Sequence, residues 1–179
     1  MALFDLKQYR VRGRVAIAEK TFDIETLDGA LVAVATTGLR GFLSGSFTVV
    51  EDGNEILALH GAILGRKTTV AAGDRAIGWI QLPIIADADG FELATLIVDE
   101  HDTLFQVVAV DGAKLGELVR EWRGMIDETI NEANTYEVSI TPAGESRPGT
   151  AELLLAISLL IDDRYPRDRY DSSLSPQSS

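Results

Sequence analysis

Few residues of this chain combine the types and spacing that catalysis or metal binding requires. The acidic turn 99–102 (Asp-Glu-His-Asp) offers carboxylate and imidazole ligands, but its place between two apolar runs is typical of a solvated hairpin loop. His60 and His101 are the only histidines, and cysteine is absent, which excludes disulfides and thiolate zinc sites. No serine lies in a Gly-x-Ser-x-Gly turn, and the glycine-rich stretch 38–45 lacks the Lys-Ser/Thr pair of a phosphate loop. We therefore expect a protein that is not an enzyme.

Three arginines near the carboxyl end are candidates for contacting lipid phosphates: Arg164, Arg167 and Arg169. Guanidinium groups bind phosphate oxygens through several N–H donors. Their alternative role is to lie near the negative end of a preceding helix, where the neighbouring acids Asp162, Asp163 and Asp168 oppose them.

The net charge of −12 restricts the classes of partner. It arises from 28 acidic against 16 basic residues, and such a field repels nucleic acids and disfavours anionic lipid. Lysine is scarce among the basic residues. This composition suits a high-salt cytoplasm, and it equally suits a GC-rich genome that favours arginine. The first twenty residues are mixed and charged, without the apolar core of a secretory signal, so we expect a cytoplasmic protein.

The segment 150–163 (TAELLLAISLLIDD) predicts a helix that is apolar on all sides. Nine apolar positions surround its circumference, interrupted only by Glu152 and Ser158. Such a helix must be buried in protein or lipid, and its length of about 21 Å is short of the roughly 30 Å of a bilayer core. The residues expected to form this structural central helix are Leu153, Leu154, Leu155, Ile157, Leu159, Leu160 and Ile161.

The preceding chain reads as a series of β-hairpins. Turn pairs of Asp and Gly recur at 28–29, 52–53, 73–74, 89–90 and 111–112. Four hairpins are predicted at 21–26 with 31–35, 46–50 with 55–59, 67–72 with 76–82, and 91–98 with 104–110. Glycine tolerates the positive φ of a tight hairpin turn, so this pattern predicts an all-β sandwich or barrel.

The segment 115–130 has two interpretations. Its apolar residues follow the spacing of an amphipathic helix. Against that, it follows the turn at 111–112 directly, as the second strand of a hairpin does, and Gly116 and Gly124 each weaken a helix by about 1 kcal/mol. The alternative is a strand to about Trp122, then a short helical turn.

Several runs carry a family resemblance. Residues 115–128 (LGELVREWRGMIDE) and 131–138 (NEANTYEV), with 155–162 (LAISLLID) and 76–81 (AIGWIQ), resemble the phospholipid scramblase family over about residues 20–163. The same architecture occurs in plant LURP-one-related proteins and in the tubby C-terminal domain. The resemblance implies a mainly β fold, a closed antiparallel β-barrel of about twelve strands around the buried C-terminal α-helix. It also implies that 114–122 is a strand.

The resemblance implies lipid chemistry that this chain retains only in part. Animal members of the family move phospholipids between leaflets under calcium stimulation. The stretch that matches their calcium loop runs from Glu132 to Ala143, and Glu132 and Asn134 are its remaining candidate metal ligands. Calcium takes six to eight oxygen ligands, so we expect neither calcium dependence nor another cofactor. The palmitoylated cysteines and proline-rich leader of the animal proteins are absent too.

These observations lead to one domain and two functional hypotheses. Residues 1–165 are expected to form a single scramblase or LURP-one-like barrel with its central helix at 150–163, and 166–179 a disordered polar tail. The first hypothesis is a scramblase-like protein that binds or translocates phospholipid, peripheral at a membrane. The alternative is a soluble structural or protein-interaction β-barrel module without lipid activity. Neither requires nucleic acid.

Overall fold

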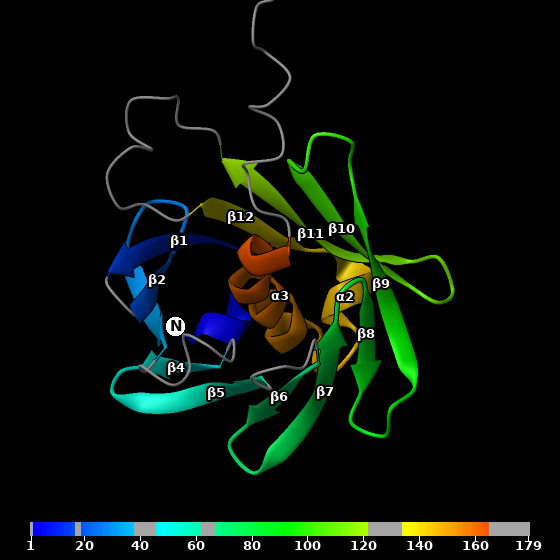
Figure 1. The fold of residues 1–179 in the computed structure, drawn as a ribbon, viewed down its shortest axis with the longest axis horizontal. Helices are drawn as coiled ribbons and strands as arrows, with labels where there is room; N and C mark the ends of the chain where they lie inside the picture. Colours follow the sequence, from blue (N-terminus) through cyan, green and yellow to red (C-terminus); the bar gives the residue numbers. More distant parts are fainter. Residues whose placement is uncertain (1, 17–18, 38–45, 62–66, 122–133, 165–179) are drawn as a thin grey trace, which may run out of the picture.

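The computed structural model describes residues 2–16, 19–37, 46–61, 67–121 and 134–164. Within them lie twelve strands, a 3-10 turn and two α-helices (Figure 1). The strands are β1 (Gln8–Ala16), β2 (Glu19–Glu25), β3 (Leu31–Thr36), β4 (Phe47–Glu51), β5 (Asn54–Gly61), β6 (Thr68–Ala72), β7 (Arg75–Gln81), β8 (Ile84–Asp87), β9 (Glu92–Val98), β10 (Leu104–Ala109), β11 (Lys114–Glu121) and β12 (Thr135–Ile140). The helical segments are η1 (Leu3–Asp5), α2 (Pro142–Glu145) and α3 (Thr150–Arg164).

The twelve strands form one closed antiparallel barrel. Each strand pairs with the next along the chain, and β1 pairs with both β2 and β12. The closing register places Gln8 opposite Ser139 and Val11 opposite Tyr136. Closure leaves none of these strands with an unpaired edge, which is how barrels avoid edge-to-edge association. The predicted fold class is therefore confirmed.

The Asp-Gly pairs form the tight turns that the sequence predicts. At the β4–β5 connection, Asp52 and Gly53 have φ angles of 48° and 79°. Positive φ at both central residues is characteristic of a type I′ hairpin turn, and glycine adopts it without steric cost. The four predicted hairpins correspond to β2–β3, β4–β5, β6–β7 and β9–β10.

Helix α3 occupies the centre of the barrel (Figure 1). Because successive strand residues point to opposite faces, each strand contributes alternate apolar side chains to the lining around it. The buried apolar side chains of the helix are Leu153, Leu154, Leu155, Ala156, Ile157, Leu159 and Ile161, while Leu160 is half-buried. The helix that is apolar on all sides is thus enclosed by strands of its own chain. Among the described residues no helix has the length and apolarity to cross a membrane.

Gly116 lies in β11 at a point where helix α3 comes close to this strand. A Cβ at this position of β11 would lie 2.5 Å from Leu154 Cδ1 and 2.7 Å from the carbonyl oxygen of Ser139. Only glycine therefore lets α3 approach β11 this closely. The strand interpretation is confirmed by β11 over residues 114–121, and residue 122 lies outside the described residues. The helical turn expected after Trp122 and the polar tail 166–179 lie outside the described residues.

A short connection turns the chain from the barrel wall into its interior. Thr141 caps α2, its Oγ1 accepting a hydrogen bond from the Gly144 amide at 3.2 Å, and Pro142 follows at the first helical position. Gly144 packs directly on β11, where an added Cβ would lie 2.1 Å from the Leu115 carbonyl oxygen. Helix α2 and the linker 146–149 therefore bring the start of α3 to one end of the barrel.

Candidate functional site

Most of the side chains predicted to bind lipid or metal lie outside the described part of the structure. This holds for Glu132, Arg167 and Arg169, and also for the side chain of Arg164, although its backbone ends α3. Asn134 is half-buried just before β12, and its carbonyl oxygen accepts a hydrogen bond from the Gly13 amide at 3.2 Å. The six residues that follow form β12, so much of the stretch that matches the calcium loop is paired strand. Within the described ranges, no three His, Asp or Glu side chains are grouped to hold a metal.

The acidic turn 99–102 is organised by its own first residue. Asp99 Oδ1 accepts hydrogen bonds from the amides of Thr103 at 2.7 Å and Leu104 at 2.8 Å, and Oδ2 accepts one from the Thr103 hydroxyl at 2.8 Å. Slight burial raises the pKa of Asp99, but the hydrogen bonds from Leu104 and Thr103 outweigh it and lower the pKa below its usual value. The carboxylate thus has a structural role in the turn.

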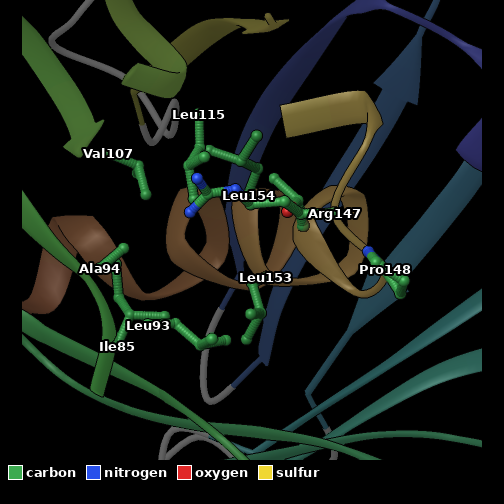
Figure 2. Close-up of a pocket in the computed structure, with 10 residues that line it drawn as sticks. Ile85, Leu93, Ala94, Val107, Leu115, Arg147, Pro148, Leu153 and Leu154 are labelled. Carbon is green, nitrogen blue, oxygen red and sulfur yellow. The ribbon is translucent and has the colours of Figure 1, made fainter. Parts of the chain in front are cut away.

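A small apolar pocket lies at one end of the barrel, where α3 begins (Figure 2). Its volume is about 40 Å³, and its walls include Ile85, Ala94, Val107 and Leu115 from the strands and Leu153 and Leu154 from α3. Arg147, in the linker before α3, completes the wall and pairs with Asp111 of the β10–β11 turn, Nη2 to Oδ2, at 2.5 Å. The pocket therefore combines an apolar interior with one arginine in its wall, and the acidic partner of that arginine, Asp111, adjoins the pocket without lining it.

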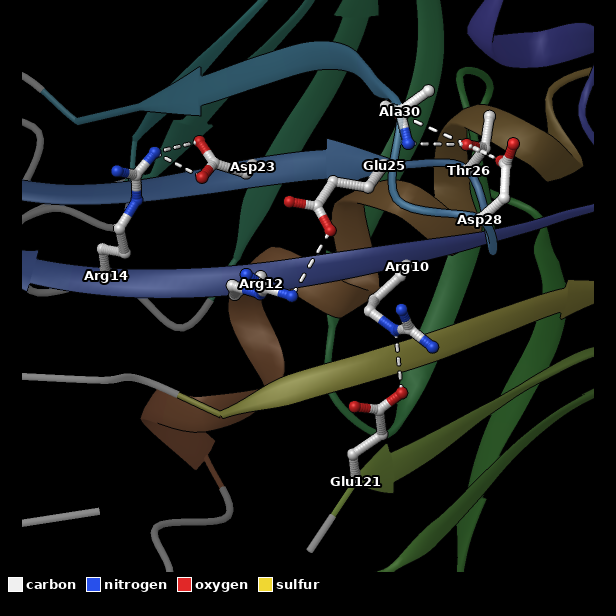
Figure 3. Close-up of polar contacts among 9 residues, drawn as sticks. All are labelled: Arg10, Arg12, Arg14, Asp23, Glu25, Thr26, Asp28, Ala30 and Glu121. Carbon is white, nitrogen blue, oxygen red and sulfur yellow. Dashed lines mark hydrogen bonds and ion pairs between the residues drawn. The ribbon is translucent and has the colours of Figure 1, made fainter. Parts of the chain in front are cut away.

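The outside of the barrel has two contrasting faces. On β1 and its neighbours three arginines pair with acids (Figure 3): Arg10 Nε lies 2.8 Å from Glu121 Oε1, Arg12 Nη2 lies 3.5 Å from Glu25 Oε2, and Arg14 pairs with Asp23. Because each guanidinium already faces a carboxylate, this charged face is not an open anion-binding surface.

On β8 to β11, apolar side chains point outward instead. We call Ile84, Ile97, Leu104, Val108 and Val119 the outer apolar face. Ile84, Ile97 and Val119 are 38%, 50% and 42% exposed, and the other two are half-buried. Cross-strand pairing places Leu104 directly opposite Val119, and both Ile84 and Val108 opposite Thr95. Ile97 lies opposite Gln106, which in turn lies opposite Glu117, so polar side chains separate the apolar ones across this face.

Two buried polar groups of the interior were not identified from the sequence. The hydroxyl of Tyr9, on β1, is fully enclosed and has no hydrogen-bond partner among the described residues. Burial, with a further contribution from the Glu152 carboxylate, raises the pKa of Tyr9 above its usual range. Arg120, on β11, donates to the Tyr136 hydroxyl at 2.9 Å and 3.1 Å, and its guanidinium lies 5.2 Å from the centre of the Phe105 ring. The sequence could have identified Arg120 by its position two residues after Leu118, because residues two apart on a strand point to the same face.

Comparisons with known proteins bear on the fold. No protein-family model and no curated protein matches the chain. Among solved structures, the X-ray structure of the Arabidopsis thaliana protein AT5G01750 superposes with a TM-score of 0.60, covering 88% of this chain and 91% of that one at 9% sequence identity. The fold is a tubby-like barrel. At this identity the likeness concerns the fold alone.

Proposed function

We propose that this protein is a non-enzymatic interaction module that binds a protein partner through the outer apolar face. Helix α3 fills the barrel, so the outside is the surface left for a macromolecule. The observation that carries the proposal is the group of outward apolar side chains gathered on four neighbouring strands, β8 to β11. Exposed apolar side chains grouped together and mixed with polar ones are typical of protein interaction sites.

The charges around this face favour a basic partner. The acidic turn 99–102 adjoins it at Leu104, and the whole chain carries a net charge of −12. Glu117 also lies between the apolar side chains, but Lys114 already pairs with it. Attraction between a negative rim and a positive partner accelerates association and selects among partners. The expected occupant is a protein segment with aliphatic residues flanked by lysine or arginine.

Matched surface variants test this proposal. We expect partner capture from a cell extract of the native host, in the full-length protein, to be lost in the double variant Ile97→Ser, Val119→Ser. It should persist in Leu31→Ser, which removes an even more exposed leucine from β3, a strand outside the outer apolar face. The recovered partner should bind the purified protein directly, and its affinity should fall with rising salt. Equal capture by both variants, or an affinity indifferent to salt, contradicts the proposal.

A second candidate is phospholipid binding or translocation, which the family resemblance implies. The observation that favours it is the pair of exposed side chains Phe91 and Val110, at 72% and 69% exposure, at the turns before β9 and after β10. Exposed aromatic and aliphatic residues at neighbouring loops can enter the interfacial region of a bilayer. The Val110 amide donates to the Leu93 carbonyl oxygen at 3.2 Å, which fixes the two turns relative to each other.

Vesicle binding separates the two candidates. Under the second, the protein is cytoplasmic and peripheral at a membrane, and it sediments with zwitterionic vesicles better than with anionic ones because of its negative charge. Phe91→Ser should reduce that binding, whereas the outer-face double variant should not. A leaflet-exchange assay with and without calcium tests translocation. Absence of binding to every vesicle composition removes this candidate.

A further inference from the structure

We propose that the apolar pocket beneath Arg147 is a binding site for an aliphatic α-amino acid. The site lies where the barrel wall meets the start of α3, on the inner side of the same four strands that carry the outer apolar face, and it does not depend on the function proposed above. Its two parts, the apolar interior and the charged pair, each correspond to one part of such a ligand.

The interior has the size and character of a site for a branched aliphatic side chain. One water needs about 10–15 Å³ of such volume, so about 40 Å³ holds roughly three waters or a group of three to four carbons. Water in an apolar pocket finds few hydrogen-bond partners, and Ala94, Leu153 and Leu154 offer none from their side chains. An isobutyl or isopropyl group would gain contacts with all three walls and release poorly bonded water.

Arg147 and Asp111 provide a counterpart for the charged end of the ligand. A guanidinium has five N–H donors, and the contact with Asp111 occupies the Nη2 atom, so a carboxylate can be bound by the remainder. The pocket is also lined by Thr150, the first residue of α3, and the positive end of a helix dipole favours an anionic group.

Asp111 makes the site favour an amino acid over a ligand that carries only a carboxylate. Hydrogen bonds from the Ala113 amide and then from Arg147 hold the pKa of Asp111 below its usual value, so the carboxylate is charged at neutral pH. A ligand with a carboxylate alone would meet this negative group and the negative field of the whole chain. An α-ammonium group would instead pair with Asp111. Because the side chains of Arg147 and Asp111 are 36% and 60% exposed, the two can adjust their positions at little cost when the ligand enters.

Calorimetric titration of the full-length protein with L-leucine tests the assignment. Three comparison ligands each lack one feature: isovalerate lacks the ammonium group, isoamylamine lacks the carboxylate, and glycine lacks the side chain. We expect leucine to bind at least about tenfold more tightly than each of them, since every missing feature leaves one part of the site unfilled.

Variants assign the binding to this pocket. Arg147→Gln and Asp111→Asn should each weaken leucine binding by about tenfold or more, and Ala94→Leu should abolish it by filling the pocket. Arg14→Gln makes the same change of charge on β1 and should leave the affinity unchanged. Arg147→Gln lies at the surface, so its effect is measured on folded protein even where Ala94→Leu destabilises the barrel.

Three results would overturn the inference. They are the absence of saturable leucine binding up to about 10 mM, equal affinity for leucine and isovalerate, and unchanged affinity in Arg147→Gln. None of these readouts involves a protein partner or a vesicle, so failure here leaves the function proposed for the outer face unaffected.

Discussion

Replacing one leucine of α3 measures how deeply its side chain is buried between the helix and the strands. Leu154 is fully buried and faces Gly116, whereas Leu160, on the same helix, is half-buried. Leu154→Ala should cost about 3–5 kcal/mol, from lost burial and from the cavity left behind. Leu160→Ala is the matched control, with the same chemical change in the same helix, and should cost about 1–2 kcal/mol.

Urea denaturation followed by circular dichroism provides the measurement. With an m-value of about 2 kcal/mol per M, the midpoint should fall by about 2 M for Leu154→Ala and by less than about 1 M for Leu160→Ala. The m-value should not change, because the variants unfold from the same barrel. Equal midpoint shifts for the two variants would contradict the difference in burial between Leu154 and Leu160 on which this prediction rests.

Gly116 extends this test to the contact itself. Gly116→Ala should destabilise the protein by about 1–3 kcal/mol, because the new Cβ meets Leu154 Cδ1 at 2.5 Å and the Ser139 carbonyl oxygen at 2.7 Å. In a Leu154→Ala background the first contact disappears and the second remains, so the additional cost of Gly116→Ala should be smaller by about 0.5 kcal/mol or more. If the destabilisations of Gly116→Ala and Leu154→Ala simply add in the double variant, the two side chains are not in contact.

Three further variants probe the polar groups. Tyr9→Phe should leave the melting temperature unchanged or raise it, because its buried hydroxyl lacks a partner in the described structure; a loss above about 1 kcal/mol would reveal one. Asp99→Asn should cost about 1 kcal/mol at neutral pH, allowing for solvent exposure. Because its folded pKa is lowered, this difference should disappear as acid titration falls below about pH 4, and a constant difference would be inconsistent with the turn. Glu152→Gln should cost about 1–2 kcal/mol in thermal melts, since Glu152 is buried in the first turn of α3 and pairs with Arg75 at 2.7 Å; an unchanged melt would contradict this.

Local features account for the parts of the fold that could be predicted. The Asp-Gly pairs specify their own turns through backbone φ, and each turn fixes the register of its two strands, so the hairpins follow from neighbouring residues. The helix 150–163 is equally local, since its composition alone demands enclosure. Strand β8, with four residues, and helix α2 are too short to give a periodic signal.

The candidate sites depend on contacts between distant residues, which spacing does not encode. Arg147 and Asp111 are separated by 36 residues and meet only because α2 folds back onto β11. The outer apolar face combines residues from four strands. One part of this face could be recognised from the sequence: at Leu96 and Ile97, two consecutive apolar residues break the alternation of a half-buried strand. The sequence around them does not indicate which residues of the neighbouring strands lie beside Ile97.

The position of β1 between β2 and β12 has a consequence for synthesis. Residues 8 and 139 must meet for the wall to close, so closure waits until nearly the whole barrel sequence has been synthesised. Helix α3 follows β12, so the apolar side chains that line the barrel gain their central occupant last. Pairing residues so far apart in sequence carries a loop-closure cost that neighbouring hairpins avoid, so we expect closure to be a late and slow step of folding, during which the uncovered lining favours aggregation.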